Sequence, residues 1–326
     1  MQRHALVTGG AGFIGSHLCD RLAADGWFVT IVDNLSSGSR DSVAPLLASG
    51  HARLLECDVR DTHRFAPLFR DVGCVFHLAA EVSVARSVEQ PVLCADVNVL
   101  AFVDILQLAR ERSVPVVYAS SSAVYGNRDD AAIGEDAPPP APTSPYGASK
   151  LADEAFARAA TDSFGVPTVG LRFFNVYGPR QNPDGDYAAV VPAFIRAALS
   201  GKAPQIHGDG RQTRDFVFVS DVVRALAESA LRAADLAGDV LNVGSGTATA
   251  ILELARITAG CADGSPLPPV FLPRRPGDIR NSCADIRKMR TALGMNGSTP
   301  IGEGIAETAR WFRTREHPLK GLNEHE

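Results

Sequence analysis

The sequence predicts an α/β fold in which a doubly wound parallel sheet is followed by a second, smaller α/β domain. Short runs of β-branched and apolar residues alternate with longer helical patterns through the first half of the 326-residue chain. These runs lack the in-and-out alternation of a half-exposed strand, as expected where helices cover both faces of a parallel sheet. Strand–helix alternation of this kind implies right-handed crossovers. A chain of this length is typical of about two domains.

The first domain is expected to span residues 1–174. Its strands are expected at residues 4–8, 27–32, 52–57, 74–79, 114–120 and 167–173. Helical spacing of apolar residues is found between them, at residues 13–24, 62–70, 91–112 and 146–164. The order of these segments is that of repeated strand–helix–strand units.

The second domain is expected to span residues 175–326. After about Arg172, glycine and proline interrupt shorter elements, as in "HGDGRQTRD" at residues 207–215. Residues 215–219 and 240–244 are strand-like, and part of the 215–244 segment is expected to return to the first sheet. The boundary between the two domains is therefore not a single point in the chain.

Composition, charge and cysteine spacing exclude several classes of protein. A net charge of −5 predicts no basic surface, so nucleic acid is not an expected partner. The six cysteines are scattered without CxxC spacing, so we expect a reducing, cytoplasmic setting and neither disulfides nor a metal site. No hydrophobic leader precedes the first strand, and no apolar run approaches the roughly 20 residues that span a bilayer, so no membrane association is expected.

A glycine motif, "VTGGAGFIGSHL" at residues 7–18, lies between the first expected strand and the first helix. Gly9 permits the tight turn, Gly12 lets the backbone approach a pyrophosphate, and Gly15 lets the helix pack closely on the strand. The helix N-terminus adds N–H groups and a positive partial charge for the phosphates. The alternative is a merely glycine-rich turn. The strand–motif–helix order favours a Rossmann-type dinucleotide site.

Two acidic residues follow the next strands. Asp33 comes 18 residues after Gly15, where a carboxylate accepts hydrogen bonds from the adenosine ribose and repels a 2′-phosphate. The predicted cofactor is therefore NAD rather than NADP. Asp58 follows the third strand and is expected to bond the adenine; the alternative is that it only caps a helix.

Four motifs, "TGGAGFIG", "HLAA", "YGASK" and "RFFNVYGPRQ", occur in this order along nearly the whole chain. Together they resemble the extended short-chain dehydrogenase/reductase family, in its branch of NAD-dependent sugar-nucleotide epimerases and dehydratases, and especially the bacterial UDP-N-acetylglucosamine 4-epimerases. The resemblance implies that NAD contacts Gly9, Gly12, Phe13, Ile14, Gly15, Asp33, Asn34, Asp58, Val59, Leu78, Ala79, Ala80, Asn98, Ser120, Tyr146, Lys150 and Phe173.

Tyr146 and Lys150 in "YGASK" lie four residues apart, on one face of an expected helix. A tyrosine with the ordinary pKa near 10 is a poor base at neutral pH, but an adjacent ammonium favours the phenolate. An ordinary amphipathic helix is the alternative interpretation of this spacing. The preceding "ASSSAVYG" supplies the remaining hydroxyls: the resemblance implies that Ser121 polarises the sugar hydroxyl, whereas Ser120 faces the cofactor and Tyr125 is a packed aromatic.

The residues after Ser121 bear on the reaction. Related 4,6-dehydratases carry an Asp-Glu pair there, whereas this chain has Ser122 and Ala123, which disfavours dehydration and, for the same reason, decarboxylation. The resemblance then implies 4-epimerisation of a UDP-hexose through a 4-keto sugar, with catalytic residues Ser121, Tyr146 and Lys150. A non-catalytic NAD-binding protein is the remote alternative, and a uronate 4-epimerase would need a cation such as Arg86.

For the sugar nucleotide, the resemblance implies a diphosphate clamp of Arg214 and Arg275 and a ribose-binding acid, Asp278; surface salt bridges are the alternative for the arginines. Ser282 stands where UDP-galactose-restricted relatives hold a bulky tyrosine, which leaves room for an N-acetyl group. Val82 and Ala123 depart from the N-acetyl-preferring pattern, so a UDP-glucose/UDP-galactose or dual-specificity epimerase is the main alternative. The substrate-binding residues are then Ser83, Ser121, Ser122, Asn175, Gln181, Ala189, Val190, Arg214, Arg275, Asp278 and Ser282.

The resemblance also implies a homodimer. Relatives pair through two long helices of each subunit, and residues 91–112 and 146–164 have the required length. The apolar stripes of these helices are equally compatible with packing on the sheet.

Overall fold

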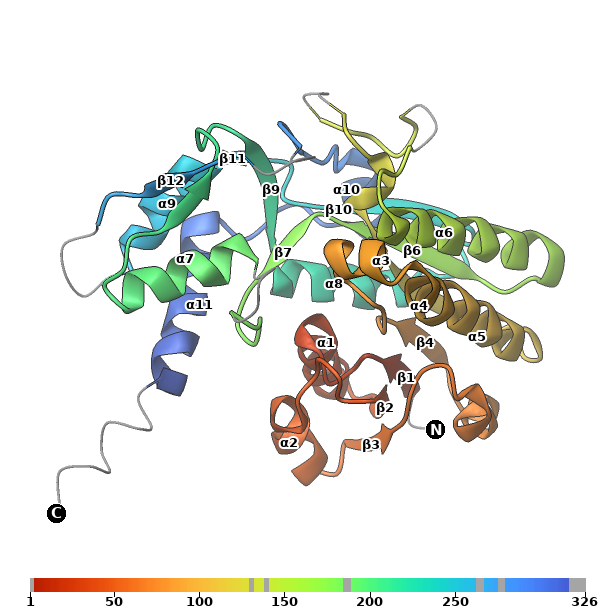
Figure 1. Cartoon of the computed structure of the whole chain (residues 1–326). Coiled ribbons are helices and arrows are strands. Elements are labelled where there is room, and N and C mark those ends of the chain that lie inside the picture. The colour runs from red at the N-terminus through yellow and green to blue at the C-terminus, as the bar shows by residue number, and fades with distance from the viewer. Residues whose placement is uncertain are drawn as a thin grey trace, which may run out of the picture.

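A seven-stranded parallel sheet forms the larger part of the molecule in this computed structural model, which describes residues 3–128, 132–137, 141–183, 189–261, 267–274 and 279–316 (Figure 1). The strand order is β10-β6-β5-β4-β1-β2-β3, and every pair of neighbours is parallel. The strands are β1 (His4–Thr8), β2 (Phe28–Asp33), β3 (Ala52–Glu56), β4 (Cys74–His77), β5 (Val116–Ser121), β6 (Thr168–Phe173) and β10 (Asp239–Val243).

Two apolar layers hold helices against the two faces of this sheet. Ala5 and Val7 of β1 belong to one layer, whereas Leu6 between them belongs to the other, and all three are fully buried. The first layer packs helices α1 (Phe13–Ala24), α2 (Arg40–Ala48), α8 (Val219–Leu231) and α10 (Arg287–Leu293). The second layer packs α5 (Ala101–Arg110) and α6 (Pro145–Phe164). The predicted doubly wound fold is thereby confirmed.

Some connections differ from the expected helices. Residues 62–70 form two short 3-10 turns, η1 (Thr62–Arg64) and η2 (Ala66–Arg70), because Pro67 at the start of η2 lacks the N–H that a continuous helix would need. Helix α2 fills a crossover to which the sequence pattern assigned no helix. Residues 91–110 are one helical path made of α4 (Pro91–Ala95), a π-turn η3 (Asp96–Leu100) and α5.

This continuous helix corrects one expectation from the sequence. Residues Pro91–Arg110 form a 20-residue helix with a mean hydropathy of 1.8, long and apolar enough by length and composition to cross a membrane. The expectation that no segment approaches this length was therefore wrong. One face packs on the sheet through Phe102 and Ile105, which are fully buried, while Val92 and Leu100 on the opposite side are exposed.

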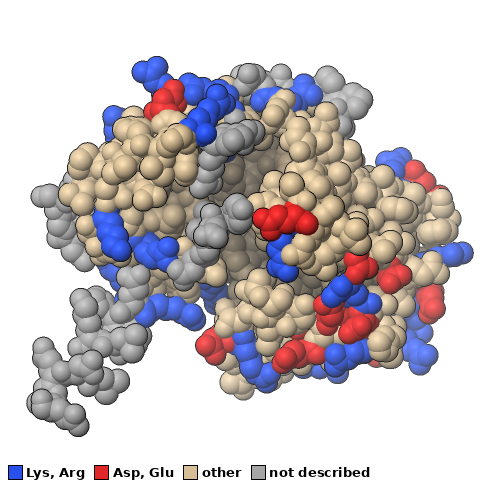
Figure 2. Space-filling model, in the orientation of Figure 1, with Lys and Arg blue, Asp and Glu red and all other residues tan. Residues whose placement is uncertain are grey.

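Shorter elements form the second part of the molecule. It contains a three-stranded sheet of β7 (Asn175–Tyr177), β9 (Thr213–Phe218) and β11 (Ala248–Ala250), and a pair of β8 (Gln205–His207) and β12 (Val270–Leu272). Helices α7 (Val190–Leu199), α9 (Ile251–Ala259) and α11 (Ile301–Glu316) pack beside them. Strand β10 joins the seven-stranded sheet beside β6, whereas β9 stays in the three-stranded sheet. The molecular surface is hollowed between the two parts (Figure 2).

Candidate active site

The glycine motif forms the turn between β1 and α1. Gly9 has a φ of +68°, and a Cβ on it would lie 2.7 Å from the backbone nitrogen of Ala79. A Cβ on Gly15 would collide with the carbonyl oxygen of Gly9. Both positions therefore require glycine, as the motif predicts. The N-cap of α1 is Gly12, which offers no side-chain cap, and the first turn carries no acidic residue. Its N–H groups are thus suited to a phosphate ligand.

Asp33 at the end of β2 reaches back to this turn. Its Oδ2 accepts a hydrogen bond from the backbone N–H of Ala11 at 2.9 Å, and its Oδ1 accepts one from Leu35 at 2.8 Å. A carboxylate has about four lone-pair directions, so acceptor capacity remains for ribose hydroxyls. Leu35 itself adopts a φ of 58°, a left-handed conformation that the bond to Asp33 stabilises. The donor and acceptor set of this corner fits the adenosine end of NAD.

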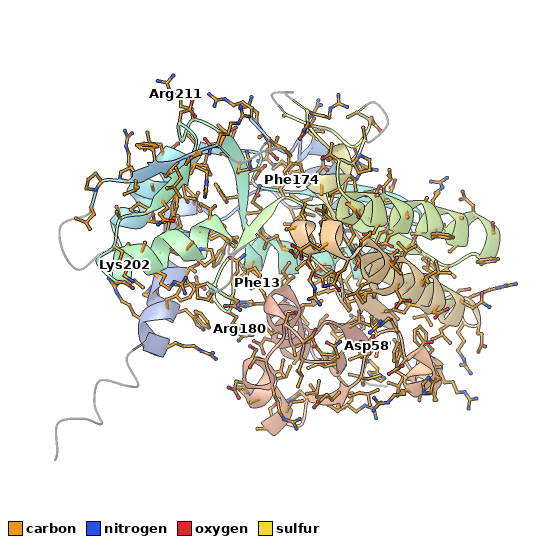
Figure 3. All side chains as sticks on the ribbon, viewed as in Figure 1. Phe13, Asp58, Phe174, Arg180, Lys202 and Arg211 are labelled. Atoms are coloured by element: carbon orange, nitrogen blue, oxygen red, sulfur yellow. The ribbon has the colours of Figure 1, made fainter. Side chains whose placement is uncertain are left out.

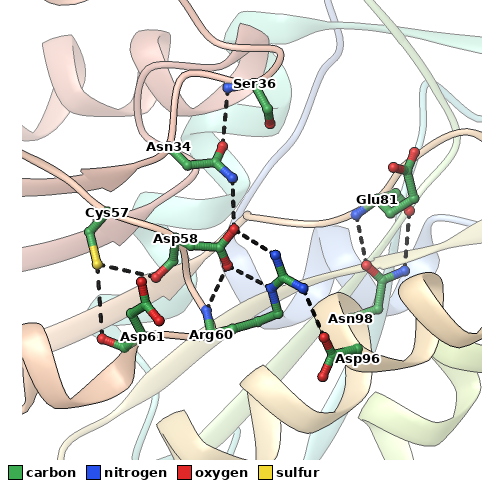
Figure 4. A network of polar contacts seen from close by, with 9 residues as sticks. All are labelled: Asn34, Ser36, Cys57, Asp58, Arg60, Asp61, Glu81, Asp96 and Asn98. Carbon is green, nitrogen blue, oxygen red and sulfur yellow. Dashed lines mark hydrogen bonds and ion pairs between the residues drawn. The ribbon is translucent and has the colours of Figure 1, made fainter.

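Asp58 follows β3 (Figure 3) and lies in a network of polar contacts (Figure 4). Its Oδ1 accepts from the backbone N–H and the Nε of Arg60, and its Oδ2 accepts from the guanidinium of Arg60 and the Nδ2 of Asn34, at 2.9–3.0 Å. Hydrogen bonds from Arg60 hold the pKa of Asp58 well below its usual range. Arg60 also bonds Asp96 of η3 at 2.9 Å. All four acceptor directions of Asp58 are thus engaged within the protein.

The segment after β4 completes the cofactor side. Leu78 donates its N–H to the carbonyl oxygen of Thr8 at 3.1 Å, and Ala79 packs against Gly9, which places Leu78, Ala79 and Ala80 beside the glycine turn. Asn98 is fully buried: its amide exchanges two hydrogen bonds with the backbone of Glu81 and donates one to Ser149 of α6 at 2.9 Å. Asn98 therefore ties this segment to α6.

The three serines of "ASSSAVYG" have different surroundings. Ser120 is buried and donates its hydroxyl to Glu154 Oε1 at 2.5 Å, so its Oγ faces α6. Ser121 ends β5 in register with Phe173 of β6, and its Oγ accepts from the N–H of Ala123 at 3.1 Å. Ser122 begins the turn η4 (Ser122–Tyr125). Only Ser121 combines a strand-end position with a hydroxyl proton left to donate.

Tyr125 is the packed aromatic that the sequence suggested. It is 3% exposed, and its hydroxyl donates to Asn242 Oδ1 at 2.7 Å while accepting from Arg172 at 2.7 Å. Arg172 also donates to Glu154, and together these side chains join η4, β6, β10 and α6. Burial raises the pKa of Tyr125, which makes its hydroxyl a poor base.

Tyr146 and Lys150 occupy the first turns of α6. Ser144 caps this helix by accepting from the N–H of Gly147, and the N–H of Tyr146 donates to Ser87 of α3 (Val84–Glu89) at 3.1 Å. Lys150 is 2% exposed, and its Nζ lies 3.1 Å from Asp153 Oδ2. Burial lowers the pKa of Lys150, but the nearby Asp153 and Tyr146 outweigh this effect and raise it. The lysine is therefore an ammonium beside the tyrosine.

The second part of the molecule contributes several of the expected substrate residues. Asn175 of β7 donates its Nδ2 to the backbone oxygen of Asp215 at 3.1 Å, next to Arg214 on β9. Gln181 donates to the backbone of Val176 at 3.1 Å. Ala189 occupies the position just before α7, which Val190 begins. Arg275 and Asp278 lie outside the residues that the structure describes.

Ser83 and Arg86 lie at the start of α3 on the other wall. The Oγ of Ser83 caps the helix by accepting from the N–H of Arg86 at 3.1 Å. Arg86 is exposed and pairs with Glu81 at 3.1 Å. An arginine that faces solvent and is already paired is poorly placed to receive a sugar carboxylate.

Some residues of the site carry no local sequence signal. Glu154 and Arg172 form a buried, two-pronged ion pair, and His77 stacks on Phe102 with ring centroids 5.1 Å apart while bonding Thr8 at 2.9 Å. In the described part of the chain, no group of three or more His, Cys, Asp or Glu side chains could hold a metal ion.

A doubly wound sheet that presents a phosphate-binding turn and a tyrosine–lysine pair at its carboxyl edge is the architecture of a dinucleotide-dependent redox enzyme. Residues 5–244 match the model of the NAD dependent epimerase/dehydratase family. The chain therefore belongs to this family, and its cofactor is NAD.

Similar proteins cover nearly the whole chain. A "UDP-glucose 4-epimerase" of Mycolicibacterium smegmatis is 41% identical over 95% of this chain and 98% of its own length. The solved structure of a UDP-N-acetylglucosamine 4-epimerase from Methanobrevibacter ruminantium, in complex with UDP-N-acetylmuramic acid, is 35% identical with a TM-score of 0.90, over 96% of this chain and 99% of that one. The UDP-glucose 4-epimerase of Thermus thermophilus in complex with NAD is 37% identical with a TM-score of 0.83, over 95% and 99%.

Proposed function

We propose that the protein interconverts UDP-N-acetylglucosamine and UDP-N-acetylgalactosamine by NAD-dependent epimerisation at carbon 4. Bound NAD would supply the redox chemistry at carbon 4, as the acceptor and then the donor of one hydride. The chain itself must hold the sugar against the carboxyl edge of β5, take the proton of the 4-hydroxyl and return it. The placement of Ser121, Tyr146 and Lys150 supports this division of work.

Tyr146 is the residue we assign as the base. Lys150 is buried as an ammonium one helical turn away, and such a charge favours the phenolate. The Oγ of Ser121 accepts from the N–H of Ala123, so its own O–H remains as a donor for a sugar oxygen. The ammonium has three N–H donors, so it can also bond ribose hydroxyls of the cofactor. These roles are tested by the tyrosine variant described in the Discussion.

The absence of a carboxyl group just after Ser121 supports epimerisation over dehydration. Ser122 and Ala123 occupy the turn η4, and neither side chain can take a proton from carbon 5 at neutral pH. Oxidation and re-reduction at carbon 4 need only the tyrosine, the serine and the bound cofactor. This chemistry is what the described site residues can perform.

The small side chain of Ser282 is the feature that supports the choice of an N-acetylated sugar. It is partly exposed and lies between Asn281, whose side chain bonds Thr213 of β9 at 3.2 Å, and Ala284, whose N–H donates to Asp215 at 3.0 Å. It therefore borders the stretch of β9 that carries Arg214. A hydroxymethyl group at this position leaves space that a tyrosine ring would fill.

A substrate panel tests the assignment. Purified protein is incubated separately with UDP-GlcNAc, UDP-GalNAc, UDP-glucose and UDP-galactose, and the products are resolved by chromatography. We expect interconversion of the two N-acetylated sugars from either direction. Turnover of UDP-glucose and UDP-galactose alone would overturn the assignment.

A UDP-glucose/UDP-galactose epimerase is the second candidate. The mycobacterial relative that is 41% identical is named for UDP-glucose, which favours this substrate. A pocket that admits the N-acetyl group also has room for a hydroxyl, so dual specificity is compatible with Ser282. The ratio of kcat/KM values in the panel decides between the two candidates.

We also propose that the protein is a homodimer that pairs through the outer face of α4, η3 and α6. Val92, Leu100 and Phe156 on these elements are exposed, Val92 to 82%. Exposed apolar side chains on neighbouring helices are typical of an interface. Light scattering after gel filtration should give a dimer, and Val92→Lys with Phe156→Glu should give a monomer. A wild-type monomer would contradict the proposal.

A further inference from the structure

A buried acid lies one turn after the lysine of the site. Asp153 is 1% exposed, and its Oδ2 lies 3.1 Å from Lys150 Nζ on the same helix, α6. Its other oxygen, Oδ1, is buried and has no hydrogen-bond partner among the residues that the structure describes. Desolvation of a carboxylate without a full set of hydrogen bonds is costly. The contact with the Lys150 ammonium therefore offsets part of the cost of burying the Asp153 carboxylate.

The ionisable groups that face this pair from other elements are neutral near pH 7. Burial lowers the pKa of His77 on β4 to about 3. Burial also raises the pKa values of Tyr118 on β5 and of Cys94 on α4. These three neighbours therefore do not balance the positive charge of Lys150.

The remaining neighbours leave Asp153 as the counter-charge of the lysine. Glu154, the next residue of α6, accepts two hydrogen bonds from Arg172 of β6 at 2.8 and 2.7 Å. The π-turn η3 and helix α5 present Asn98 and Phe102, which carry no charge, and α3 presents Ser87, whose hydroxyl bonds Val84. The charge of Glu154 is thus matched by Arg172, whereas the charge of Lys150 is matched by Asp153.

The contact with Asp153 uses only one of the hydrogen-bond donors of Lys150. An ammonium has three N–H donors in a fixed tetrahedral arrangement. When one points at Asp153 Oδ2, the direction of the other two is set. The same carboxylate also offsets part of the field that the ammonium exerts on the phenol of Tyr146.

We propose that Asp153 is a positioning residue of the epimerase, which orients the Lys150 ammonium and, by partly neutralising it, sets the pH at which Tyr146 becomes an effective base. This inference rests on the proposed roles of Tyr146 and Lys150. Burial raises the pKa of Asp153 to about 6, so the carboxylate is largely ionised at neutral pH and supplies the required charge.

The test is the variant Asp153→Asn. The amide oxygen of asparagine can still accept from Lys150, but the negative charge is gone. The phenolate is then favoured, so the acid limb of the pH profile of kcat/KM moves down by about one pH unit, the order of magnitude expected for removing one nearby unit charge at an effective dielectric constant near 20. At a pH one unit below the wild-type midpoint, the variant should retain about five times the fraction of its maximal activity that the wild type retains. The KM for the UDP-sugar should stay within about twofold, because uniform substrate binding is untouched.

A direct titration reads the tyrosine without substrate. The ultraviolet difference spectrum of phenolate is recorded against pH for the protein with bound NAD, and the same curve for Tyr146→Phe is subtracted. Burial raises the pKa values of Tyr118, Tyr125 and Tyr177, so these rings ionise later. The midpoint of the remaining signal should fall by about one pH unit in Asp153→Asn, in step with the activity profile.

Two further variants make the outcome decisive. Asp162→Asn removes a carboxylate on the same helix that pairs with Arg158 at the surface, and should leave both curves in place. Asp153→Ser removes the charge with a smaller side chain and should shift the curves as Asp153→Asn does. Both variants are made so that the inference is still tested if one of them does not fold. Superimposable wild-type and Asp153 variant curves would overturn the inference while the inactivity of Tyr146→Phe upheld the proposed chemistry. An active Tyr146→Phe would instead remove the basis of both.

Discussion

Glu154 on α6 and Arg172 on β6 form a buried ion pair with two hydrogen bonds. Arg172 donates from Nε to Glu154 Oε1 at 2.8 Å and from Nη2 to Glu154 Oε2 at 2.7 Å. The same Glu154 accepts the hydroxyl of Ser120, and the same Arg172 donates to Tyr125. The pair therefore locks the strand that ends in Ser121 to the helix that carries Tyr146. It stabilises the distance between Ser121 and Tyr146, the residues proposed to act on the sugar.

Removing one member of this pair should be costly. Glu154→Gln leaves the buried guanidinium uncompensated, and we expect the free energy of unfolding to fall by about 3 kcal/mol. Urea titration followed by circular dichroism measures it. Asp162→Asn, which breaks an exposed pair with Arg158, should change stability by less than about 0.5 kcal/mol. Equal effects of the two variants would show that burial of the Glu154–Arg172 pair contributes nothing.

His77 should make stability depend on pH. Burial lowers its pKa in the folded protein to about 3, against about 6.5 in the unfolded chain, so the unfolded state binds more protons between these values and stability is lost as pH falls. His77→Phe keeps the stacking on Phe102 and removes the titration. From pH 5 to 6.5 the wild type should gain about 1.6 kcal/mol relative to this variant.

Asp153 has the opposite effect on stability over part of this pH range. Its folded pKa is raised to about 6, so between about pH 4 and pH 6 the native state binds more protons than the unfolded state. Both proteins share this contribution, so it cancels in the comparison of wild type with His77→Phe. The free energies come from urea titrations at each pH. A difference that did not change with pH would show that His77 titrates normally in the folded protein.

The glycine turn should tolerate no side chain at its third glycine. In Gly15→Ala the new methyl group would meet the carbonyl oxygen of Gly9, so α1 must move away from the turn to which we assign the pyrophosphate. We expect at least about tenfold weaker NAD binding, measured by fluorescence titration. Gly297→Ala is the control, because a Cβ there meets nothing within 4 Å. Normal NAD affinity in Gly15→Ala would contradict the assigned phosphate site.

Ser282 should control access of the N-acetyl group. Ser282→Tyr is expected to lower kcat/KM for UDP-GlcNAc by about 100-fold while changing that for UDP-glucose less than about threefold, because the ring repels only the bulkier substrate. Ser282→Ala should behave like the wild type, since the space rather than the hydroxyl is what matters. Equal losses on both substrates would place Ser282 outside the specificity-determining pocket.

The fold could be predicted because its signals are local. Strands buried on both faces must be apolar throughout, and the turn after β1 carries a glycine motif in which Gly9 and Gly15 have no room for a side chain. The short turns at 62–70 and the helix α2 were not predicted, since a proline and a weak apolar period override simple spacing there.

The site was predictable only in part. The Y-x-x-x-K spacing predicts Tyr146 and Lys150, but no sequence motif indicates Asp153. The importance of Asp153 depends on its burial against Lys150. The occupation of Asp58 by Arg60 and Asn34 depends likewise on how loops after two different strands meet. A buried charge acquires its role from its partners, and partners distant in sequence are fixed by the tertiary fold.

Tyr146→Phe should abolish turnover and leave the fold intact. Loss of the general base is expected to lower kcat by at least about 1,000-fold. Circular dichroism and the NAD content of the purified variant should match the wild type. Near-normal rates would remove Tyr146 from its assigned role.

Hydrogen at carbon 4 tests the account most directly. UDP-GlcNAc is incubated with the enzyme in deuterium oxide, and the UDP-GalNAc that forms is examined by proton NMR and mass spectrometry. If hydride leaves carbon 4 and returns to it from the bound cofactor, the product carries ordinary hydrogen at that carbon. Deuterium at carbon 4, or conversion of the sugar at any other carbon, would contradict the account.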